Sequence, residues 1–280
     1  MRLVLFFLFT FFVSAQGLAQ EPKRIVSIGG ANTEILYALG FEKQIVGTDT
    51  SSVYPEAAQV TPKVGYARAL SVEGILSLRP NLVILNDQAG PPAVLAQLKQ
   101  VGVPILVTKA ARSLADTRRN IETIATSLNA PAQKEGVLAQ IDRDLALLKD
   151  EKAGLTKTPR VLFIMQHGGG APMVAGEQTA ADSILKIAGA ENAVTGYEGY
   201  KPLTPEAVVK MDMDYILVTD LGVKAVGGMD KLLSQPGIRM TEAAKKRRVI
   251  VMEPHYLLGF GPRVGEAALK LHQQMKTTSL

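Results

Sequence analysis

The sequence has 280 residues, of which 20% are charged, and its formal net charge is +5. The basic excess is small and is not interleaved with aromatic residues along a stripe, which argues against nucleic-acid binding. No cysteine is present, so neither a disulfide framework nor a cysteine nucleophile is available.

The first 19 residues have the pattern of an export signal. Arg2 supplies a positive start, residues 3–13 form an apolar run interrupted at Thr10, and Gly17 and Ala19 are small residues suited to cleavage. The run is shorter than the roughly 20 apolar residues that span a bilayer. We expect residues 1–19 to be a cleavable signal peptide, with an uncleaved interfacial anchor as the alternative. Because a bacterial lipid anchor is built on cysteine, we expect a soluble periplasmic protein.

Beyond the signal, short apolar runs alternate with helical patterns. Runs bounded by turn residues predict strands at 24–28, 44–48, 81–85, 104–108, 160–165, 215–219 and 249–252. Amphipathic spacing between them predicts helices at 33–39, 72–78, 92–100, 180–187, 205–211 and 262–275. Strands alternating with helices indicate an α/β fold built on parallel sheets.

One block of the sequence occurs twice. Residues 71–85 match residues 204–218 without a gap, at a constant offset of 133, so that Glu73 corresponds to Glu206. A period this long indicates duplicated lobes rather than a solenoid. We expect an N-terminal lobe at 20–130 and a C-terminal lobe at 155–280.

The pattern of residues 131–154, between the lobes, predicts a single long helix. Five apolar residues recur there at helical spacing, namely Val137, Leu138, Ile141, Leu145 and Leu148, and Pro131 stands before the first turn. Such a helix would be on the order of 30 Å long and would act as a stiff spine. Because ligands bind beyond the carboxyl ends of parallel strands, we expect a binding cleft between the two lobes.

The signal, the duplicated lobe, the spine helix and the paired glutamates resemble substrate-binding proteins of ABC importers that carry haem, cobalamin or iron siderophores. Residues 65–68, Gly-Tyr-Ala-Arg, and residues 257–263, Leu-Leu-Gly-Phe-Gly-Pro-Arg, are similar to motifs of the periplasmic haem-binding proteins. The resemblance implies a class III periplasmic binding fold and haem as the transported ligand. A ferric siderophore or cobalamin is the alternative ligand.

Tyr66 and Arg68 are the first candidate site residues. A phenolate is a hard ligand suited to ferric iron, and tyrosine can hold haem iron axially. In an extended segment the side chains of residues 66 and 68 would project from the same side, and a nearby cation favours the phenolate. The resemblance implies that Tyr66 coordinates the haem iron and that Arg68 hydrogen-bonds to the phenolic oxygen. An ordinary amphipathic surface role is the alternative for Tyr66.

Two further histidines, His167 and His255, are candidates for the opposite wall. His167 follows a predicted strand and opens a glycine run, in which Gly168 and Gly169 would let a flat ligand approach the backbone. His167 would complete the coordination of one haem or hold a second, stacked haem; a turn histidine is the alternative. His255 is a weaker candidate for the cleft, and His272 is expected in the core or at the surface.

Arg263 and the two repeated glutamates complete the candidate site. Arg263 could pair with a haem propionate, since guanidinium matches a carboxylate bidentately, and a structural salt bridge is the alternative. Ser71 and Thr204 are predicted N-caps, which places Glu73 and Glu206 in first helical turns. The resemblance implies that these glutamates dock on arginines of an inner-membrane ABC permease dimer.

Enzyme classes find little support in the sequence. No Gly-x-Ser-x-Gly or His-Glu-x-x-His motif occurs, and neither glycine run gives the dinucleotide-binding fingerprint. We therefore expect no enzymatic activity; the resemblance implies a haem carrier, which we expect to be a monomer.

Overall fold

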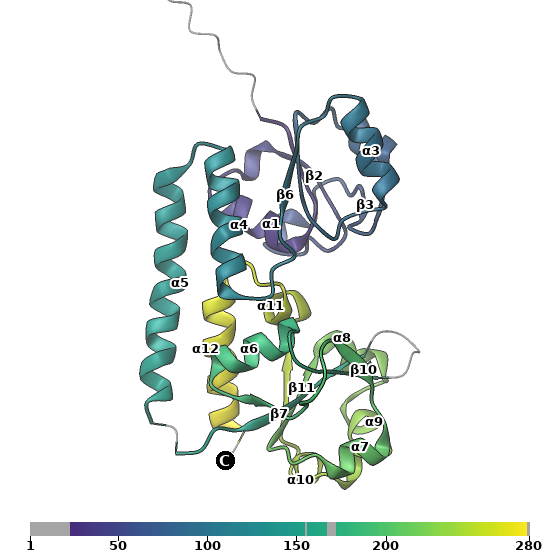
Figure 1. Ribbon diagram of the computed structural model, residues 1–280, viewed down its shortest axis with the longest axis vertical. Helices are drawn as coiled ribbons and strands as arrows, with labels where there is room; N and C mark the ends of the chain where they lie inside the picture. The colour runs from purple at the N-terminus through teal and green to yellow at the C-terminus, as the bar shows by residue number, and fades with distance from the viewer. Residues whose placement is uncertain (1–22, 155, 167–171, 279–280) are drawn as a thin grey trace, which may run out of the picture.

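The computed structural model describes residues 23–154, 156–166 and 172–278, which form two α/β lobes beside one long helix, α5 (Pro131–Lys152) (Figure 1). The expected signal peptide, residues 1–19, lies outside the described residues, as do His167, Gly168 and Gly169. Across the described ranges, no helix combines the length and the apolar character that crossing a bilayer requires.

The N-terminal lobe contains a four-stranded parallel sheet in the order β2-β1-β5-β6. Its strands are β1 (Ile25–Ser27), β2 (Ile45–Thr48), β5 (Leu82–Asn86) and β6 (Ile105–Thr108). Its helices are α1 (Gly30–Ala38), α2 (Val72–Ser77), α3 (Pro92–Gln100) and α4 (Leu114–Ser127), with short 3-10 helices η1 (Glu42–Gln44) and η2 (Glu56–Ala58). The four strands were all predicted. Helix α4 was not predicted, and neither was a small hairpin made of β3 (Gly65–Tyr66) and β4 (Ala69–Leu70).

The C-terminal lobe is built on three parallel strands, β7 (Arg160–Met165), β11 (Tyr215–Thr219) and β12 (Val249–Met252), as predicted. Three short strands extend this sheet: β9 (Glu191–Asn192) runs parallel to β7, while β8 (Met173–Ala175) and β10 (Tyr200–Pro202) add an antiparallel arm. The arm makes the sheet mixed, a feature that the alternation of strands and helices did not predict. The helical elements are α6 (Ala180–Ala188), α7 (Pro205–Lys210), α8 (Asp220–Ala225), α9 (Met229–Leu233), η3 (Ile238–Met240), α10 (Glu242–Lys245), α11 (Pro254–Leu258) and α12 (Val264–Thr277).

The structure confirms the internal repeat. Helices α2 and α7 lie at equivalent places in the sequence, again 133 residues apart, and β5 and β11 are related in the same way. Each of these helices is capped as predicted, because Ser71 Oγ accepts a hydrogen bond from the backbone N–H of Gly74 (3.0 Å) and Thr204 Oγ1 accepts one from Ala207 (3.3 Å). The pairing of β1 with β5 corresponds to that of β7 with β11.

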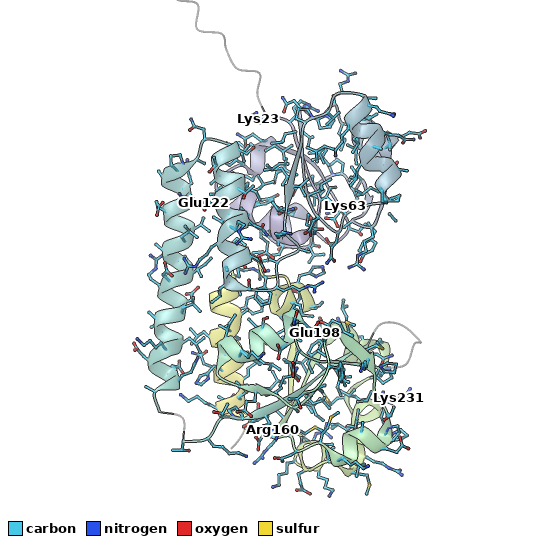
Figure 2. All side chains as sticks on the ribbon, in the orientation of Figure 1. Lys23, Lys63, Glu122, Arg160, Glu198 and Lys231 are labelled. Carbon is cyan, nitrogen blue, oxygen red and sulfur yellow. The ribbon has the colours of Figure 1, made fainter. Side chains whose placement is uncertain are left out.

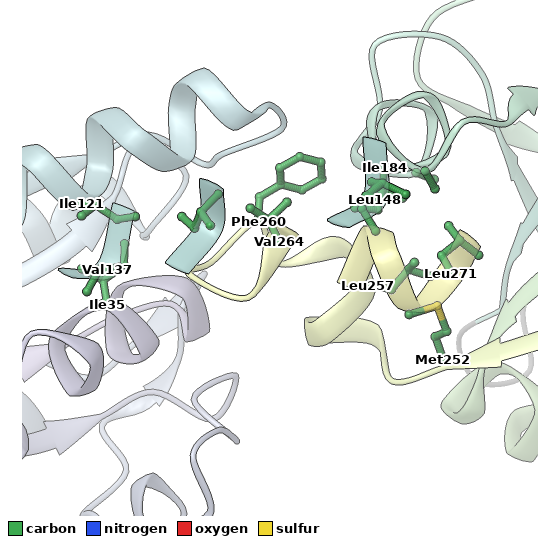
Figure 3. Packing of buried hydrophobic residues seen from close by; sticks show 14 of the residues in the cluster. Ile35, Ile121, Val137, Leu148, Ile184, Met252, Leu257, Phe260, Val264 and Leu271 are labelled. Atoms are coloured by element: carbon green, nitrogen blue, oxygen red, sulfur yellow. The ribbon is translucent and has the colours of Figure 1, made fainter. Parts of the chain in front are cut away.

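A single hydrophobic core joins both lobes to the spine. Alternate side chains of each sheet point toward it, such as Ile25 and Ile84 in one lobe and Phe163 and Leu217 in the other. Between the sheets the core continues through buried residues of α4, α5, α6 and α12, among them Ile121, Val137, Leu148, Ile184 and Leu271 (Figure 3). The other face of each sheet packs on its own smaller core. The lobes therefore share one packed interior, which favours small rocking motions over a wide hinge opening.

A partly buried ion pair joins the two lobes. Arg263, just before α12, donates from Nε and Nη2 to the two carboxylate oxygens of Glu34 on α1, at 2.8 and 2.7 Å. The guanidinium carbon lies 3.5 Å from the ring centroid of Tyr54 and 4.9 Å from that of Tyr256. Burial raises the pKa of the Glu34 carboxyl, and the bond to Arg263 acts in the opposite direction. The structural salt bridge, left open as the alternative for Arg263, is thus present.

Arg263→Met should lower the free energy of unfolding by about 3–5 kcal/mol, because Glu34 would be left as a buried carboxylate without its cation. Arg118→Met is the matched control, since Arg118 pairs with Asp142 on the exposed surface and should cost less than about 1 kcal/mol. Urea denaturation of the two variants measures both values. Equal, small losses would show that the buried pair does not hold the lobes together.

Candidate functional site: the cleft between the lobes

A cavity of about 510 Å³ lies between the lobes and is lined by residues of both. Its N-terminal wall comes from residues 66–68 of the β3–β4 hairpin and from residues 29–32, Ser51, Asn86, Gln88 and residues 109–111. All but the hairpin residues lie at or just beyond the carboxyl end of a strand. Leu221 follows β11 in the same way, and α11 follows β12. The cavity therefore lies where open parallel sheets bind ligands, and its volume is typical of small-molecule sites. Figure 2 shows side chains entering this opening from both sides.

A second hollow, of about 600 Å³, lies between α5 and the start of α12. Arg263 lines this second hollow and is absent from the lining of the cleft cavity. Tyr66, Arg68 and His255, in contrast, all line the cleft cavity. Because it unites these three candidates and both lobes, we take the cleft cavity as the functional site.

Tyr66 reaches the cavity from the β3–β4 hairpin. Gly65 makes this hairpin possible: its φ is +109°, and a Cβ there would lie 2.6 Å from the carbonyl oxygen of Ala69. The hairpin is tied to the lobe by the N–H of Thr50, which donates to the Gly65 carbonyl, and by the N–H of Gly90, which donates to the Ala67 carbonyl, both at 2.9 Å. The Tyr66 side chain is 51% exposed. An anchored turn thus presents a phenol that is open to a ligand.

Arg68 does not follow Tyr66 in an extended segment, so that part of the sequence analysis was wrong. Tyr66 pairs with Ala69 across the hairpin, and Ala67 and Arg68 form the two-residue turn between the strands. Arg68 Nη2 donates to Gln88 Oε1 at 3.0 Å. The guanidinium is therefore held beside the cavity by a residue that follows β5, and both side chains line the cavity although the chain reverses at Arg68.

His255 lies on the opposite wall, in the first turn of α11. Glu253 is the N-cap of this helix and accepts hydrogen bonds from the backbone N–H groups of His255 (3.0 Å) and Tyr256 (2.6 Å). The same carboxylate lies 3.1 Å from His255 Nδ1, a contact that raises the pKa of the imidazole. Burial opposes a low pKa for Glu253, but the His255 and backbone bonds outweigh it, so the pKa of Glu253 is lowered. His255 therefore favours its charged form more than an isolated histidine does.

The two walls approach closely at Gly30. A Cβ on Gly30 would lie 2.8 Å from the carbonyl oxygen of Ser51 and 3.5 Å from Cδ2 of His255. Behind this wall, the fully buried Asp49 orders the loops: one carboxylate oxygen accepts from the N–H of Gly29 (2.8 Å) and the other from that of Ser51 (3.0 Å). Small residues and a buried carboxylate thus shape the floor of the cavity.

Several lining residues were not predicted from the sequence, notably Lys109, Gln88 and Leu221. Each follows a strand that was predicted, so its position at a carboxyl end was the available signal. A position just after a predicted strand identifies a loop near the cavity, but it does not show which side chains of that loop point into the cavity.

The remaining candidates lie elsewhere. His272 is buried, and its Nδ1 lies 2.9 Å from the carbonyl oxygen of Ala188, so it is one of the core residues that the sequence analysis allowed for. Glu73 and Glu206 are exposed on α2 and α7, away from the cavity. His167, Gly168 and Gly169 lie outside the described residues.

Comparison with known proteins identifies the class. A family model described as periplasmic binding protein matches residues 25–256, and the chain belongs to this family. This membership agrees with the prediction of a substrate-binding protein rather than an enzyme.

Two solved structures are especially similar. The periplasmic haem-binding protein BhuT, in complex with two haems, is 41% identical, with a TM-score of 0.88 over 92% of this chain and 99% of that one. The periplasmic haem-binding protein RhuT from Roseiflexus sp. RS-1, in apo form, has the same identity, TM-score and coverage.

Curated relatives are more distant. An uncharacterised ABC transporter substrate-binding lipoprotein of Bacillus subtilis, YvrC, is 29% identical over 92% of this chain and 81% of its own length. The vitamin B12-binding protein of Pectobacterium carotovorum is 25% identical over 92% of this chain and 90% of its own length.

The His255–Glu253 contact gives a pH-dependent signal. Because the pKa of His255 is raised above the roughly 6.5 of an unfolded chain, its contribution to stability is complete below about pH 6.5 and is lost as the pH rises through the folded value. An NMR titration of the imidazole should give a pKa above about 6.5, and Glu253→Gln should lower it. Glu198→Gln is the control, because Glu198 is an exposed carboxylate that pairs with Gln178. An unshifted His255 titration in Glu253→Gln would contradict this assignment.

Proposed function

We propose that this protein captures haem in the cleft between its lobes and delivers it to an inner-membrane ABC permease. The observation that carries the proposal is the position of Tyr66, an exposed phenol on an anchored hairpin that lines a cavity shared by both lobes. The 41% identity to two haem-binding proteins of the same fold supports haem as the ligand.

Tyr66 would act as the axial ligand of ferric haem iron, because phenolate oxygen is a hard anionic donor. Arg68 lines the same cavity and would favour the ionised phenol. His167 as a second ligand, with Gly168 and Gly169 beside it, stays a prediction, and so does the number of haems. The BhuT structure with two haems makes two stacked haems a reasonable stoichiometry to test.

Arg263 would support binding indirectly. Its guanidinium is occupied by Glu34, and the segment that it holds carries α11 and thereby His255. The salt bridge would therefore keep one wall of the cavity in place.

Cobalamin is the second candidate ligand, because the vitamin B12-binding relatives span nearly the whole chain. They are 25% and 24% identical, below the 41% of the haem-binding structures. A siderophore or cobalamin carrier does not need a protein ligand to the metal, so the contribution of the Tyr66 oxygen separates these alternatives.

Tyr66→Phe should weaken haem binding by about 100-fold, since it removes the oxygen donor and keeps the ring. A Soret titration with hemin measures the affinity and reports the coordination change. Tyr54→Phe is the control: Tyr54 is 45% exposed, similar to Tyr66, and does not line the cavity. Wild-type affinity and spectrum in Tyr66→Phe would eliminate this residue as the iron ligand.

Docking on the permease would use Glu73 and Glu206. Both carboxylates are exposed in the first turns of repeat-related helices. Helix α2 packs against α3, and Figure 1 shows α3 and α7 on the side of the molecule away from α5. Two equivalent carboxylates on one side suit a permease dimer that presents two equivalent basic pockets.

Glu73→Lys with Glu206→Lys should reduce binding to the permease by at least about tenfold, because like charges would meet across the interface. Hemin affinity should not change, since neither residue lines the cavity. Glu122→Lys, on the exposed surface of α4, is the control for the change in charge (Figure 2). Pull-down on permease-containing nanodiscs measures the effect, and undiminished binding of the double variant would refute this docking surface.

The family is extracytoplasmic. Export through residues 1–19, a soluble periplasmic form without a lipid anchor and a monomeric state stay predictions. N-terminal sequencing of the mature protein and its sedimentation velocity address them.

A further inference from the structure

We propose that the cleft recognises carboxylate groups of its ligand, using Lys109 from the N-terminal lobe and His255 from the C-terminal lobe. This inference rests on the proposed function and extends it, because it names the chemical feature by which the site would select its ligand. Neither residue is needed as an iron ligand.

The charges that line the cavity are all of one sign. Among the described residues that line the cavity, three have basic side chains: Arg68, Lys109 and His255. No described lining residue is an aspartate or a glutamate. Over the described residues as a whole, acidic and basic side chains are intermixed, so this segregation is local. A cavity with only basic groups on its walls attracts an anionic ligand.

The backbone of Lys109 is held in place by side-chain hydrogen bonds from a neighbouring residue. Asn120 on α4 is buried and holds the Lys109 backbone at both ends: its Oδ1 accepts from the Lys109 N–H, and its Nδ2 donates to the Lys109 carbonyl, both at 2.9 Å. Asp87 then accepts from the N–H of Ala110 (2.9 Å) and lies 3.3 Å from Lys109 Nζ.

The Lys109 ammonium remains available to a ligand. Its side chain is 59% exposed and that of Asp87 is 38% exposed. An ion pair this exposed contributes about 0–1 kcal/mol, so exchange of the ammonium to a ligand carboxylate costs little.

His255 is held in an equivalent way on the other wall. Its Nδ1 faces Glu253, and its Cδ2 edge faces Gly30 across the cleft, which leaves Nε2 as the donor that Glu253 does not occupy. The carboxylates that act on this imidazole are Glu253, Asp49 and Glu34. None of the three lines the cavity: Asp49 bonds backbone and serine groups, and Glu34 bonds Arg263. All three favour the imidazolium without offering a negative group to the ligand.

The arrangement matches a flat ligand that carries carboxylates at its edge. Ionised propionates of a porphyrin would meet Lys109 and His255, and each charge-assisted hydrogen bond adds more than a neutral one. Cobalamin carries amides at its periphery and gains no such benefit. The two basic walls would thus discriminate between the two ligand classes that the relatives of this protein bind.

The test separates carboxylate recognition from iron ligation by using porphyrins without iron. Fluorescence titration with protoporphyrin IX and with its dimethyl ester compares a diacid with the same ring lacking free carboxylates. Wild-type protein should bind the diacid about 100-fold more tightly, since two charged contacts contribute roughly tenfold each. Lys109→Gln and His255→Gln should each weaken diacid binding about tenfold and leave ester binding unchanged. Lys99→Gln, an exposed change on α3 outside the cavity lining, should alter neither.

Unchanged ester binding in each variant also shows that the cavity is intact. Equal wild-type affinity for the diacid and the ester would overturn the inference, as would full diacid preference in the Lys109→Gln, His255→Gln double variant. A hemin titration of Tyr66→Phe is run in parallel. If the diacid preference depends on both residues while hemin binding ignores Tyr66, carboxylate recognition stands and the proposed iron ligand falls. The reverse result removes carboxylate recognition and leaves the proposed iron ligand in place.

Discussion

The shared hydrophobic core along α5 and α12 is the constraint on which the rest of the structure depends. Both sheets bury one face against it, so the lobes cannot separate without exposing residues such as Val137, Leu148 and Leu271 to water. Exposing this apolar surface to water would cost far more free energy than a weak ligand contact contributes. The cleft is therefore a nearly preformed site, and binding does not have to supply the free energy for a large closure.

In a preformed cleft, ligand recognition depends on the loops at the ends of the strands. The hairpin that carries Tyr66 is fixed by bonds between backbone groups, whereas the loop that carries Lys109 and the helix that carries His255 are fixed by side-chain bonds to the backbone. The buried side chain of Asn120 supplies the bonds to the Lys109 loop, and the buried Asp49 supplies similar bonds to the neighbouring loops at Gly29 and Ser51. Such fixed groups reduce the conformational entropy that the protein itself must lose on binding. The buried Glu34–Arg263 pair serves the same end, since it fastens the segment that bears α11 to the opposite lobe.

The internal repeat separates two groups of residues: the exposed glutamates that occur in both lobes and the cavity residues that occur in one lobe only. Among the repeated positions, Glu73 and Glu206 are exposed in the first turns of the equivalent helices α2 and α7. The cavity residues break the repeat, because Tyr66 and Arg68 belong to a hairpin of the first lobe alone, whereas His255 belongs to a helix of the second. A partner with two-fold symmetry would bind the repeated glutamates, whereas an asymmetric ligand would bind the cavity residues that break the repeat.

Sequence alone determined the α/β class, the central strands of each lobe, the spine helix and the two N-caps, and it singled out Tyr66 as a candidate. These features follow from local causes, such as apolar periodicity, hydroxyl caps and a repeated pattern, all of which are present in neighbouring residues. Tertiary structure decided the antiparallel arm, the reversal of the chain at Arg68, the pairing of Arg263 with Glu34 and the entry of Lys109 into the cavity. Glu34 and Arg263 are separated by 229 residues, and the partner of a buried charge at that distance depends on how the lobes pack. No local pattern records such packing.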